Sequence, residues 1–569
     1  MRFAFSAIMM IVASMMAGSA GAESLSGKLA DRFSLNILST LTEDNAADLA
    51  LLTQFYVDRD MTPVWVDDEA PTERAHDLLH ILEMSTYDGL NPDDYDIWAI
   101  RRLMDSDHAR ALAELDLRLS LSLMQFLSDL GSGRTEPSTL DPELFVYPQD
   151  IDKAGAIEAA AEAEDIGVFV GGYRPRQVDY WRLKGVLANY RAMASNGGWS
   201  TIDPGPLMKE GDRSERVVQL RRRLQREGDL APPEDPLAPF DSELFDQRLV
   251  EAVESFQDRY GLKQDGRVGP NTLTALNTPI EQRIEQLVLN LERRRWMSDR
   301  MPSRYIYVNL ADFELQLIDQ GEVAFETPVV IGSLYNKTPV FSADMTYMVI
   351  NPYWNVPPSI ATSELLTKAK ADSSFFRRNG FDIFENWSAE AEILDSTSID
   401  WTRVEPQNFS YKLRQRPGPT NSLGRLKFMM PNDYNIYLHD TPERAHFDLN
   451  ERSFSHGCVR VADPEALANA ILEGQSGWTL NGIVDAVGSG ERTQVNLDQS
   501  LSVQITYLTA WVDGDNRAHF RNDVYDRDQI LADALTNNPR RRGLGLFAEG
   551  TSTEARLQDD SPEAAAAAQ

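Results

Sequence analysis

The stretch Ser455-His456-Gly457-Cys458-Val459-Arg460 holds the only cysteine of the 569-residue chain. A cysteine becomes a strong nucleophile as its thiolate, and a neighbouring base or cation favours that form near neutral pH. His456 precedes Cys458 by two positions, Arg460 follows it by two, and Gly457 allows a substrate to approach the backbone closely. Because a lone cysteine is usually a small buried hydrophobic residue, it is these neighbours that predict a nucleophilic site.

A second histidine, His439, lies upstream of this motif and ends the apolar run 436–438, which predicts a strand. Either histidine has the chemistry of a general base. His456 would share a strand face with Cys458 but lie about 6.5 Å along it. The residues alone therefore leave the identity of the base open.

This arrangement resembles the L,D-transpeptidases of bacterial cell walls, in which a histidine, a spacer and Ser/Thr-His-Gly-Cys precede a basic or amide residue. The resemblance implies that Cys458 is the nucleophile and that His439 is the proton donor and acceptor. It leaves an orienting or site-lining role for His456, and the backbone N–H groups near Gly457 and Cys458 are candidate oxyanion donors. We further expect substrate-binding roles for Arg460, Ser455, Trp354 and Asn421.

Two questions about the site stay open at this stage. Arg460 either holds the motif in an ion pair or binds a substrate carboxylate, for which the planar guanidinium is well suited. His439, His456 and Cys458 are also residue types that bind zinc, but their spacing matches no common zinc pattern. We therefore expect neither a metal nor a cofactor, and a zinc hydrolase is the weaker alternative.

The chain is strongly acidic, with a formal charge of −33 from 88 acidic and 55 basic residues. A surface of this charge repels phosphate backbones, so we do not expect nucleic acid as a partner. The single cysteine excludes a disulfide within the chain. The length predicts several domains, and a hydrophobic content of 42% is enough for packed cores.

The first 22 residues have the composition of a secretory signal. Arg2 gives the positive start, residues 7–17 form an apolar run, and Ala20-Gly21-Ala22 is a small-residue cleavage site. We expect cleavage and a periplasmic protein that meets the membrane only through this segment. An uncleaved anchor is the alternative, although the apolar run is shorter than the roughly 20 residues of a membrane span.

Residues 23–200 have helical patterning. Apolar side chains recur there at steps of three and four, which predicts an amphipathic helix; they are Leu112, Leu115, Leu119, Leu123, Phe126, Leu127 and Leu130. The region resembles the scaffold domain of the large Gram-negative L,D-transpeptidases, and its residues give no indication of chemistry.

Residues 207–277 form a smaller unit. Two apolar helical faces are followed by the tight turn Asp265-Gly266 and by Pro270, a residue that favours the first turn of a helix. The segment resembles the three-helix peptidoglycan-binding module. Its motif residues are mostly core and turn residues, so a helical spacer that binds nothing stays an equal alternative.

From about residue 300 the pattern changes to alternating strands, which predicts a mostly-β, sandwich-like catalytic domain over residues 300–490. An interruption at 359–423 is, by the resemblance, a capping subdomain over the substrate cleft. We expect a β-rich extension over 491–535 and a disordered tail over 536–569. The predicted fold class is multidomain α+β, with a helical scaffold, a three-helix module and the capped β domain.

The resemblance implies acyl transfer from a cell-wall stem peptide through a thioester on Cys458, which gives direct links between the third residues of two stems. The same site would trim stems if water replaced the amine, or attach a wall protein. A non-catalytic wall-binding scaffold is the remaining alternative. We expect a monomer whose partners are peptidoglycan stem peptides and glycan, with other wall-synthesis proteins as further partners, and acylation by carbapenems as in the family.

Overall fold

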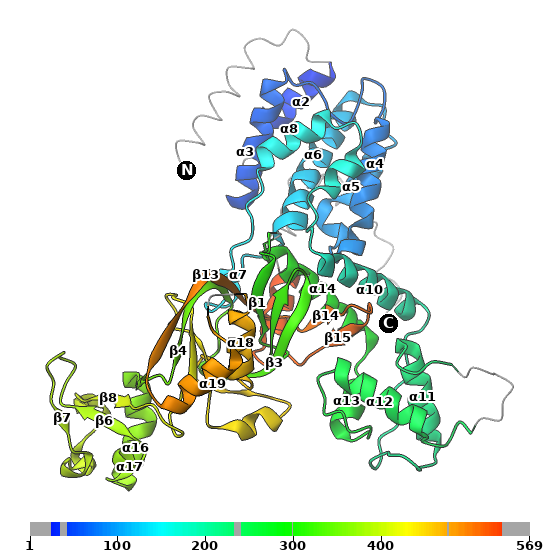
Figure 1. The fold of residues 1–569 in the computed structure, drawn as a ribbon. Coiled ribbons are helices and arrows are strands. Elements are labelled where there is room, and N and C mark those ends of the chain that lie inside the picture. Colours follow the sequence, from blue (N-terminus) through cyan, green and yellow to red (C-terminus); the bar gives the residue numbers. More distant parts are fainter. Residues whose placement is uncertain (1–23, 35–42, 233–240, 299, 475–476, 538–569) are drawn as a thin grey trace, which may run out of the picture.

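The computed structural model describes the chain in five stretches, residues 24–34, 43–232, 241–298, 300–474 and 477–537 (Figure 1). The expected signal segment and nearly all of the expected tail lie outside the described residues. Within these stretches, no helix combines the length and the apolar character that crossing a bilayer requires. As predicted, the fold is multidomain α+β, with helices before residue 300 and mostly strands after it.

Helix α6 (Ala109–Ser132) is the centre of the N-terminal helical region. All seven apolar positions that predicted this helix are fully buried. Polar positions are buried with them, because Asp116 accepts the Val64 backbone N–H and Ser120 accepts the Trp65 indole N–H, each at 2.9 Å. The helices that pack against α6 are α2 (Leu25–Ser34), α3 (Glu43–Asp58), α4 (Glu73–Glu83), α5 (Ile97–Leu103) and α8 (Lys153–Glu162).

The smaller helical module consists of α11 (Glu215–Glu227), α12 (Gln247–Arg259) and α13 (Pro270–Leu276), with Pro270 in the first turn as predicted. It shares one hydrophobic core with helix α10 (Val178–Ser195) and with the C-terminal hairpin of β14 (Ala510–Val512) and β15 (Ala518–Phe520). The Arg259 guanidinium donates to the backbone oxygen of Ala518 at 2.7 Å. The module is therefore attached to the last part of the chain as well as to its sequence neighbours.

Helix α14 (Ile280–Trp296) connects the three parts of the molecule. Its Leu287 and Leu291 pack in the core of the module, whereas Leu289 and Trp296 pack in the core of the β domain. The buried carboxylate of Glu292 accepts the backbone N–H of Thr135, in the loop after α6, at 3.1 Å. A helix buried on every side in this way has no solvated face in its last two turns.

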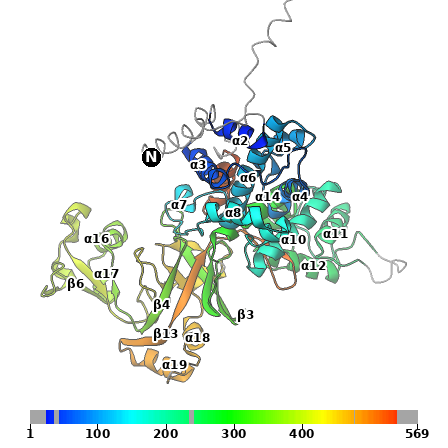
Figure 2. The same ribbon diagram turned by 90° about the horizontal axis from the view of Figure 1, so that it is seen from above.

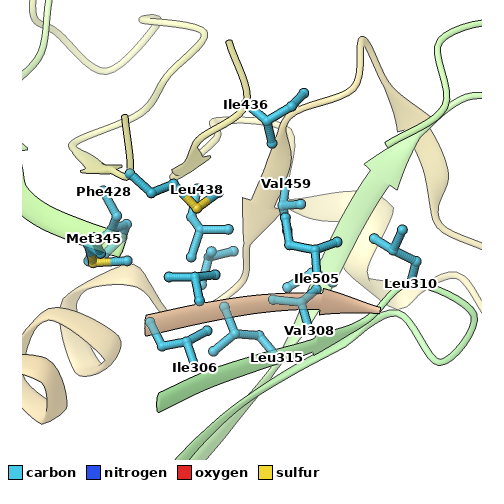
Figure 3. Close-up of a cluster of buried hydrophobic side chains, with 14 of the residues drawn as sticks. Ile306, Val308, Leu310, Leu315, Met345, Phe428, Ile436, Leu438, Val459 and Ile505 are labelled. Carbon is cyan, nitrogen blue, oxygen red and sulfur yellow. The ribbon is translucent and has the colours of Figure 1, made fainter. Parts of the chain in front are cut away.

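Nine strands form the main sheet, in the order β11-β3-β12-β10-β9-β4-β13-β1-β2. Strand β3 is long enough to pair with β2 through its first residues and with β12 and β11 through its last ones. The predicted sandwich-like body is therefore one sheet that closes on itself around the core of Figure 3. The strands are β1 (Arg304–Asn309), β2 (Glu314–Asp319), β3 (Glu322–Gly332), β4 (Phe341–Ile350), β9 (Leu426–Met429), β10 (Leu438–His439), β11 (Ser453–Ser455), β12 (Val459–Val461) and β13 (Thr493–Thr506).

Strand β13 lies between β4 and β1, in the middle of the sheet. The sequence predicts a C-terminal extension over residues 491–535, but in the structure residues 493–506 form this central strand. The difference arises because β13 pairs in parallel with β1, which lies far earlier in the chain, and no local pattern reveals such a pairing. The hairpin β14–β15 and helix α20 (Arg527–Thr536) form the part that extends beyond the sheet.

The insertion at 359–423 forms a separate small layer that stands to one side of the sheet, beyond β4 (Figure 2). Its four-stranded sheet has the order β5-β8-β6-β7, and aromatic side chains such as Phe376 and Trp401 fill its own core. Helices α16 (Leu366–Ala371) and α17 (Phe375–Arg378) cover this sheet. We refer to this layer as the cap; its strands are β5 (Trp354–Asn355), β6 (Phe381–Phe384), β7 (Ile393–Leu394) and β8 (Lys412–Gln415).

Candidate active site

Strands β10 and β12 are parallel neighbours, with Leu438 opposite Val459 and His439 opposite Arg460. Leu438 and Val459 are completely buried in the core of the β domain, as Figure 3 shows. Because side chains alternate along a strand, His439 and Arg460 lie on the other, outer face of the sheet. The alternation of apolar residues thus decides on which side the imidazole lies.

The thiol of Cys458 is on the same outer face as His439. The thiol donates to the backbone oxygen of Asn435 at 3.7 Å, and the backbone N–H and hydroxyl of Tyr437 are close enough to the sulfur to lower the pKa of the thiol. His439 is one strand across and two residues along from Cys458, which puts the two Cα atoms about 8 Å apart. Among the described residues no hydrogen bond joins the imidazole to the thiol, so the structure brings the two groups together without linking them.

The imidazole of His439 is held in one tautomer. Its Nδ1 lies 2.5 Å from the backbone oxygen of Asp440, and since a carbonyl oxygen only accepts, Nδ1 carries the proton. Nε2 therefore keeps the lone pair that a general base needs. Burial lowers the pKa of His439 to about 3, and the positive charges of Arg460 and Lys427 act in the same direction. The imidazole is neutral at pH 7.

The backbone after His439 is fixed by the carboxylate of Asp440. It accepts the backbone N–H groups of Arg425 at 2.6 Å and of Thr441 at 2.7 Å. Gly424 is required beside it, because its φ is +60° and a Cβ there would lie 2.2 Å from the Asp440 carboxylate. These contacts hold the carbonyl that sets the tautomer of the imidazole.

The half-buried thiol of Cys458 is protonated in the resting site. Burial raises the pKa of this thiol, whereas the hydrogen bonds from Tyr437 and the positive charges of Lys427 and Arg460 lower it in part. Because the pKa of the thiol is raised and the imidazole is neutral, both groups are uncharged in the resting site. The proton therefore has to move from sulfur to nitrogen during the reaction.

Tyr437 and Lys427 are site residues that the sequence analysis missed. The Lys427 ammonium lies 3.7 Å from the centre of the Tyr437 ring, and Lys427 is directly opposite His439 in the β9–β10 pairing. Burial, with the negative charge of the cysteine thiolate, raises the pKa of Tyr437 far above its ordinary value, so its hydroxyl stays a donor. Tyr437 shares a strand face with His439, which was the available signal, whereas Lys427 depends on strand register.

The turn before the thiol is held by Ser455 and Thr338. The Ser455 hydroxyl donates to the backbone oxygen of Cys458 at 2.5 Å and accepts the Gly457 N–H at 3.1 Å. The Thr338 hydroxyl donates to the Gly457 oxygen at 2.7 Å, and the φ of +108° at Gly457 requires a glycine. Ser455 is buried, and its hydroxyl already makes two hydrogen bonds to the backbone, so it is not available for the expected contact with a substrate.

The expected oxyanion-binding role of Gly457 needs a correction. Its N–H already donates to Ser455, so this group is not available to a developing oxyanion. Among the described residues, the backbone N–H of Cys458 has no hydrogen-bond partner. The available donor is therefore the amide of the cysteine itself.

The remaining predicted side chains of the motif each contact a carboxylate. Nε2 of His456 pairs with Glu364, which belongs to the π-helical turn η4 (Ala361–Leu365) of the cap. Nη1 of Arg460 lies 2.5 Å from Glu443, which is the ion-pair alternative for this residue. In the described stretches no three His, Cys, Asp or Glu side chains come together as a metal-binding group.

Trp354 and Asn421 are not positioned to contact a substrate. Trp354 is 8% exposed and packs edge-on against Phe381 in the core of the cap. The fully buried amide of Asn421 donates to the backbone oxygens of Pro352 and Arg416, each at 3.0 Å. Both side chains stabilise the base of the cap, because an insertion of this size needs a core and buried partners of its own.

Three family models match consecutive segments of the chain. Residues 50–187 match a scaffold domain, residues 213–276 match a model described as "Putative peptidoglycan binding domain", and residues 303–484 match the L,D-transpeptidase catalytic domain. The last segment contains Cys458, His439 and the cap. The chain carries an L,D-transpeptidase catalytic domain.

One curated relative of this chain is a "Putative L,D-transpeptidase" of Haemophilus influenzae. The two are 33% identical over 247 residues, which cover 43% of this chain and 49% of the relative. The chain therefore spans about half the length of that protein.

Solved L,D-transpeptidase structures overlap with the chain only loosely. One from Stackebrandtia nassauensis covers 54% of this chain and 95% of its own, at 15% identity and a TM-score of 0.20. L,D-transpeptidase 3 from Mycobacterium tuberculosis, in complex with a faropenem-derived adduct, covers 36% of this chain and 60% of its own, at 11% identity and a TM-score of 0.17. TM-scores this low support no conclusion about fold or function, so the assignment of the catalytic domain depends on the family model.

Proposed function

We propose that this protein is a cysteine-dependent transpeptidase that transfers the acyl group of a peptidoglycan stem peptide. The proposal rests on one arrangement: a single thiol, an imidazole with a free Nε2 and a tyrosine hydroxyl at the sulfur share the outer face of the sheet. The matches to a transpeptidase catalytic domain and to a peptidoglycan-binding domain support the same substrate class.

The first step forms an acyl-enzyme. Nε2 of His439 accepts the proton of Cys458 while the sulfur attacks the carbonyl carbon between the third and fourth residues of the donor stem. The C–N bond then breaks, the imidazolium returns the proton to the leaving amine, and a D-amino acid departs. The product of this step is a thioester on Cys458.

The second step resolves the thioester. The side-chain amine of an acceptor stem attacks the thioester carbon and loses its proton to His439, and the sulfur leaves with that proton as the regenerated thiol. The new amide joins the third residues of two stems directly. Water in place of the amine would release a tripeptide, and a protein amine would give wall-protein attachment.

The uncharged pair fits this sequence of steps. The developing thiolate is stabilised by the two donors of Tyr437 and by the Lys427 ammonium, so these groups act when charge appears at the sulfur. The backbone N–H of Cys458 is the donor for the oxyanion of the tetrahedral intermediate. The imidazole has to approach the sulfur when a substrate is bound, as catalytic hydrogen bonds often tighten in the complex.

Peptidoglycan lies outside the cytoplasm, so an enzyme of this class acts there. Export through the signal predicted in residues 1–22 and binding of glycan by the helical module belong to the same proposal. The arrangement of the module against β14 and β15 would hold the catalytic domain close to the polymer while it works.

Acylation of the thiol tests the proposal directly. We expect intact-mass spectrometry of the folded full chain with a carbapenem to show one adduct, and none in Cys458→Ala. His439→Gln should slow adduct formation by about 100-fold or more, because a positioned base contributes that much. The exposed His76 of the helical region gives the matched control, His76→Gln. A folded parent chain that forms no adduct would contradict the proposal.

Product analysis separates the variants of the proposed reaction. With purified muropeptides, a transpeptidase gives cross-linked dimers and a trimming enzyme gives tripeptides. Attachment of a wall protein gives a product only when that protein is added to the reaction. If Cys458→Ala keeps all function in cells, the chain acts as a binding scaffold and the catalytic proposal fails.

A further inference from the structure

A pocket of about 280 Å³ opens on the outer face of the sheet, next to the site. Strands β4 and β9 contribute its apolar side chains and Lys427, the cap contributes an arginine and a tyrosine, and the residue before β13 contributes a second arginine. The side chains that line it include Arg414, Lys427, Arg492, Tyr353, Val349 and Met429. The pocket therefore lies between the cap and the sheet.

The pocket is positively charged in a chain that is otherwise strongly acidic. Three of its lining residues are cationic and none is acidic, although the chain has 88 acidic residues against 55 basic ones. Among the described residues, neither Lys427 nor Arg492 forms an ion pair; Arg492 has only a 3.4 Å contact with the side-chain oxygen of Gln494. Two of the three charges are thus not neutralised by the protein.

Arg414 is held in a fixed position. Its guanidinium pairs with Asp382 at 2.8 Å and lies 4.7 Å from the centre of the Tyr353 ring. Asp382 also pairs with Arg416, so one carboxylate serves two arginines. Nε of Arg414 is buried and has no hydrogen-bond partner within the described part of the chain. The Arg414 side chain keeps 33% of its surface exposed, and a planar guanidinium is suited to binding a carboxylate.

The pocket lies at a defined distance from the thiol. Lys427 lies two strand spacings across from Cys458 and two residues along, because both Lys427 and Arg460 are opposite His439, so the two Cα atoms are about 12 Å apart. An extended peptide covers that distance in about four residues. A peptide that crosses the strands from the thiol into the pocket passes Lys427 before it reaches Arg414 and Arg492.

We propose that this pocket is an anion subsite that binds an internal carboxylate of the peptide substrate, on the acyl side of the bond that Cys458 attacks. The inference deepens the proposed function and rests on it for the identity of the substrate. Val349 and Met429 accommodate the aliphatic part of the bound residue, and Arg414 and Arg492 bind its carboxylate, whereas Lys427 lies closer to the thiol. The cap contributes Arg414, so binding of the acidic group also connects the cap to the sheet.

Binding to an inactive chain tests the subsite without requiring catalysis. The probes are a stem tetrapeptide and its analogue with amidated internal carboxyl groups; the C-terminal carboxylate, one residue from the attacked bond, is free in both. In full-length Cys458→Ala, calorimetry should show the free acid binding about tenfold more tightly, as one charge-assisted hydrogen bond predicts. Adding Arg414→Gln or Arg492→Gln should reduce the preference to less than about twofold, by the same reasoning.

The control variant is Arg378→Gln. Arg378 is an exposed cap arginine that pairs with Asp372 and does not line the pocket, so the preference for the free acid should be unchanged. Arg492 is exposed and makes one weak contact, so its variant should fold even if Arg414→Gln loosens the cap. Equal binding of the two peptides, no binding of either, or a preference that survives both pocket variants would overturn the proposal.

The two proposals fail in different ways. If the parent chain forms an acyl-enzyme but shows no preference for the free acid, the subsite is wrong and the transpeptidase stands. If the preference is present and disappears in Arg492→Gln, but Cys458 is never acylated, the subsite stands and the catalytic proposal is wrong.

Discussion

His439 is buried and neutral at rest, yet the proposed reaction gives it a positive charge. Burial is the main reason for its low pKa, and burial makes an isolated imidazolium costly. That cost is reduced when the charge forms beside a new thiolate, because the two opposite charges stabilise each other. His439 therefore takes up protons from the solvent only weakly, but it accepts the proton of the thiol effectively.

The same property predicts a pH dependence of stability. A histidine in the unfolded chain has a pKa of about 6.5, whereas that of His439 in the folded protein is about 3. Below pH 6.5 the unfolded state binds a proton that the folded state does not, so the free energy of unfolding falls until about pH 3. Between pH 6.5 and 5 the loss is about 1.5 kcal/mol. Chemical denaturation should show a shallower decline in His439→Gln, and the parental decline in His76→Gln. Equal slopes in parent and His439→Gln would disprove the buried, neutral state.

Sequence patterns predicted the positions of Cys458 and His439 but not their surroundings. Alternation within 436–439 was sufficient to place the imidazole away from the core. The contribution of Lys427 depends on the antiparallel register of β9 and β10, which is a tertiary property. The N–H of Gly457 was expected to be free, but a hydroxyl two residues earlier binds it, and only the folded turn reveals that bond.

At the scale of elements, the cap contacts the catalytic motif through a hydrogen bond between two side chains. Glu364 of η4 pairs with His456, and both side chains are about two-fifths exposed. The expected substrate contact of Trp354 is not found, because the cap has its own core and Trp354 belongs to it. The pair of Glu364 and His456 is therefore the direct connection between the cap and the nucleophile loop.

Removing that pair should increase opening of the cap by a small amount. An exposed ion pair contributes about 0.2 to 1 kcal/mol, so Glu364→Gln should raise the opening equilibrium by at most about fivefold. Hydrogen exchange measured by mass spectrometry should become faster in peptides covering η4–α16 and the 453–458 loop. Glu405→Gln removes the Lys370 pair within the cap and is the control. If both variants change the 453–458 loop equally, the pair is not a specific connection.

At the scale of the whole molecule, α14 is the element on which the parts converge. Its last two turns are buried on all sides, which no local pattern in the sequence indicates, because each face there packs against a different part of the chain. Its Arg295 donates to Tyr180 at 3.2 Å in α10 and to the backbone of Asp88 in the helical region. Glu292 accepts from Arg295 at 3.1 Å and from the loop after α6. The helix joins the helical region, the module and the β domain by both packing and charge.

Glu292→Ala should therefore destabilise the whole assembly and not one domain. Glu292 is 1% exposed, and loss of its carboxylate leaves the buried Arg295 guanidinium without its ion-pair partner and the Thr135 N–H without its acceptor. Removing one member of a buried ion pair typically costs about 3 to 5 kcal/mol. Calorimetry should show a lower melting temperature, and the helical region should unfold separately from the β domain. Glu285→Ala changes an exposed carboxylate of the same helix and should cost less than about 0.5 kcal/mol. A loss below about 1 kcal/mol in Glu292→Ala would mean that the parts are held together by apolar packing alone.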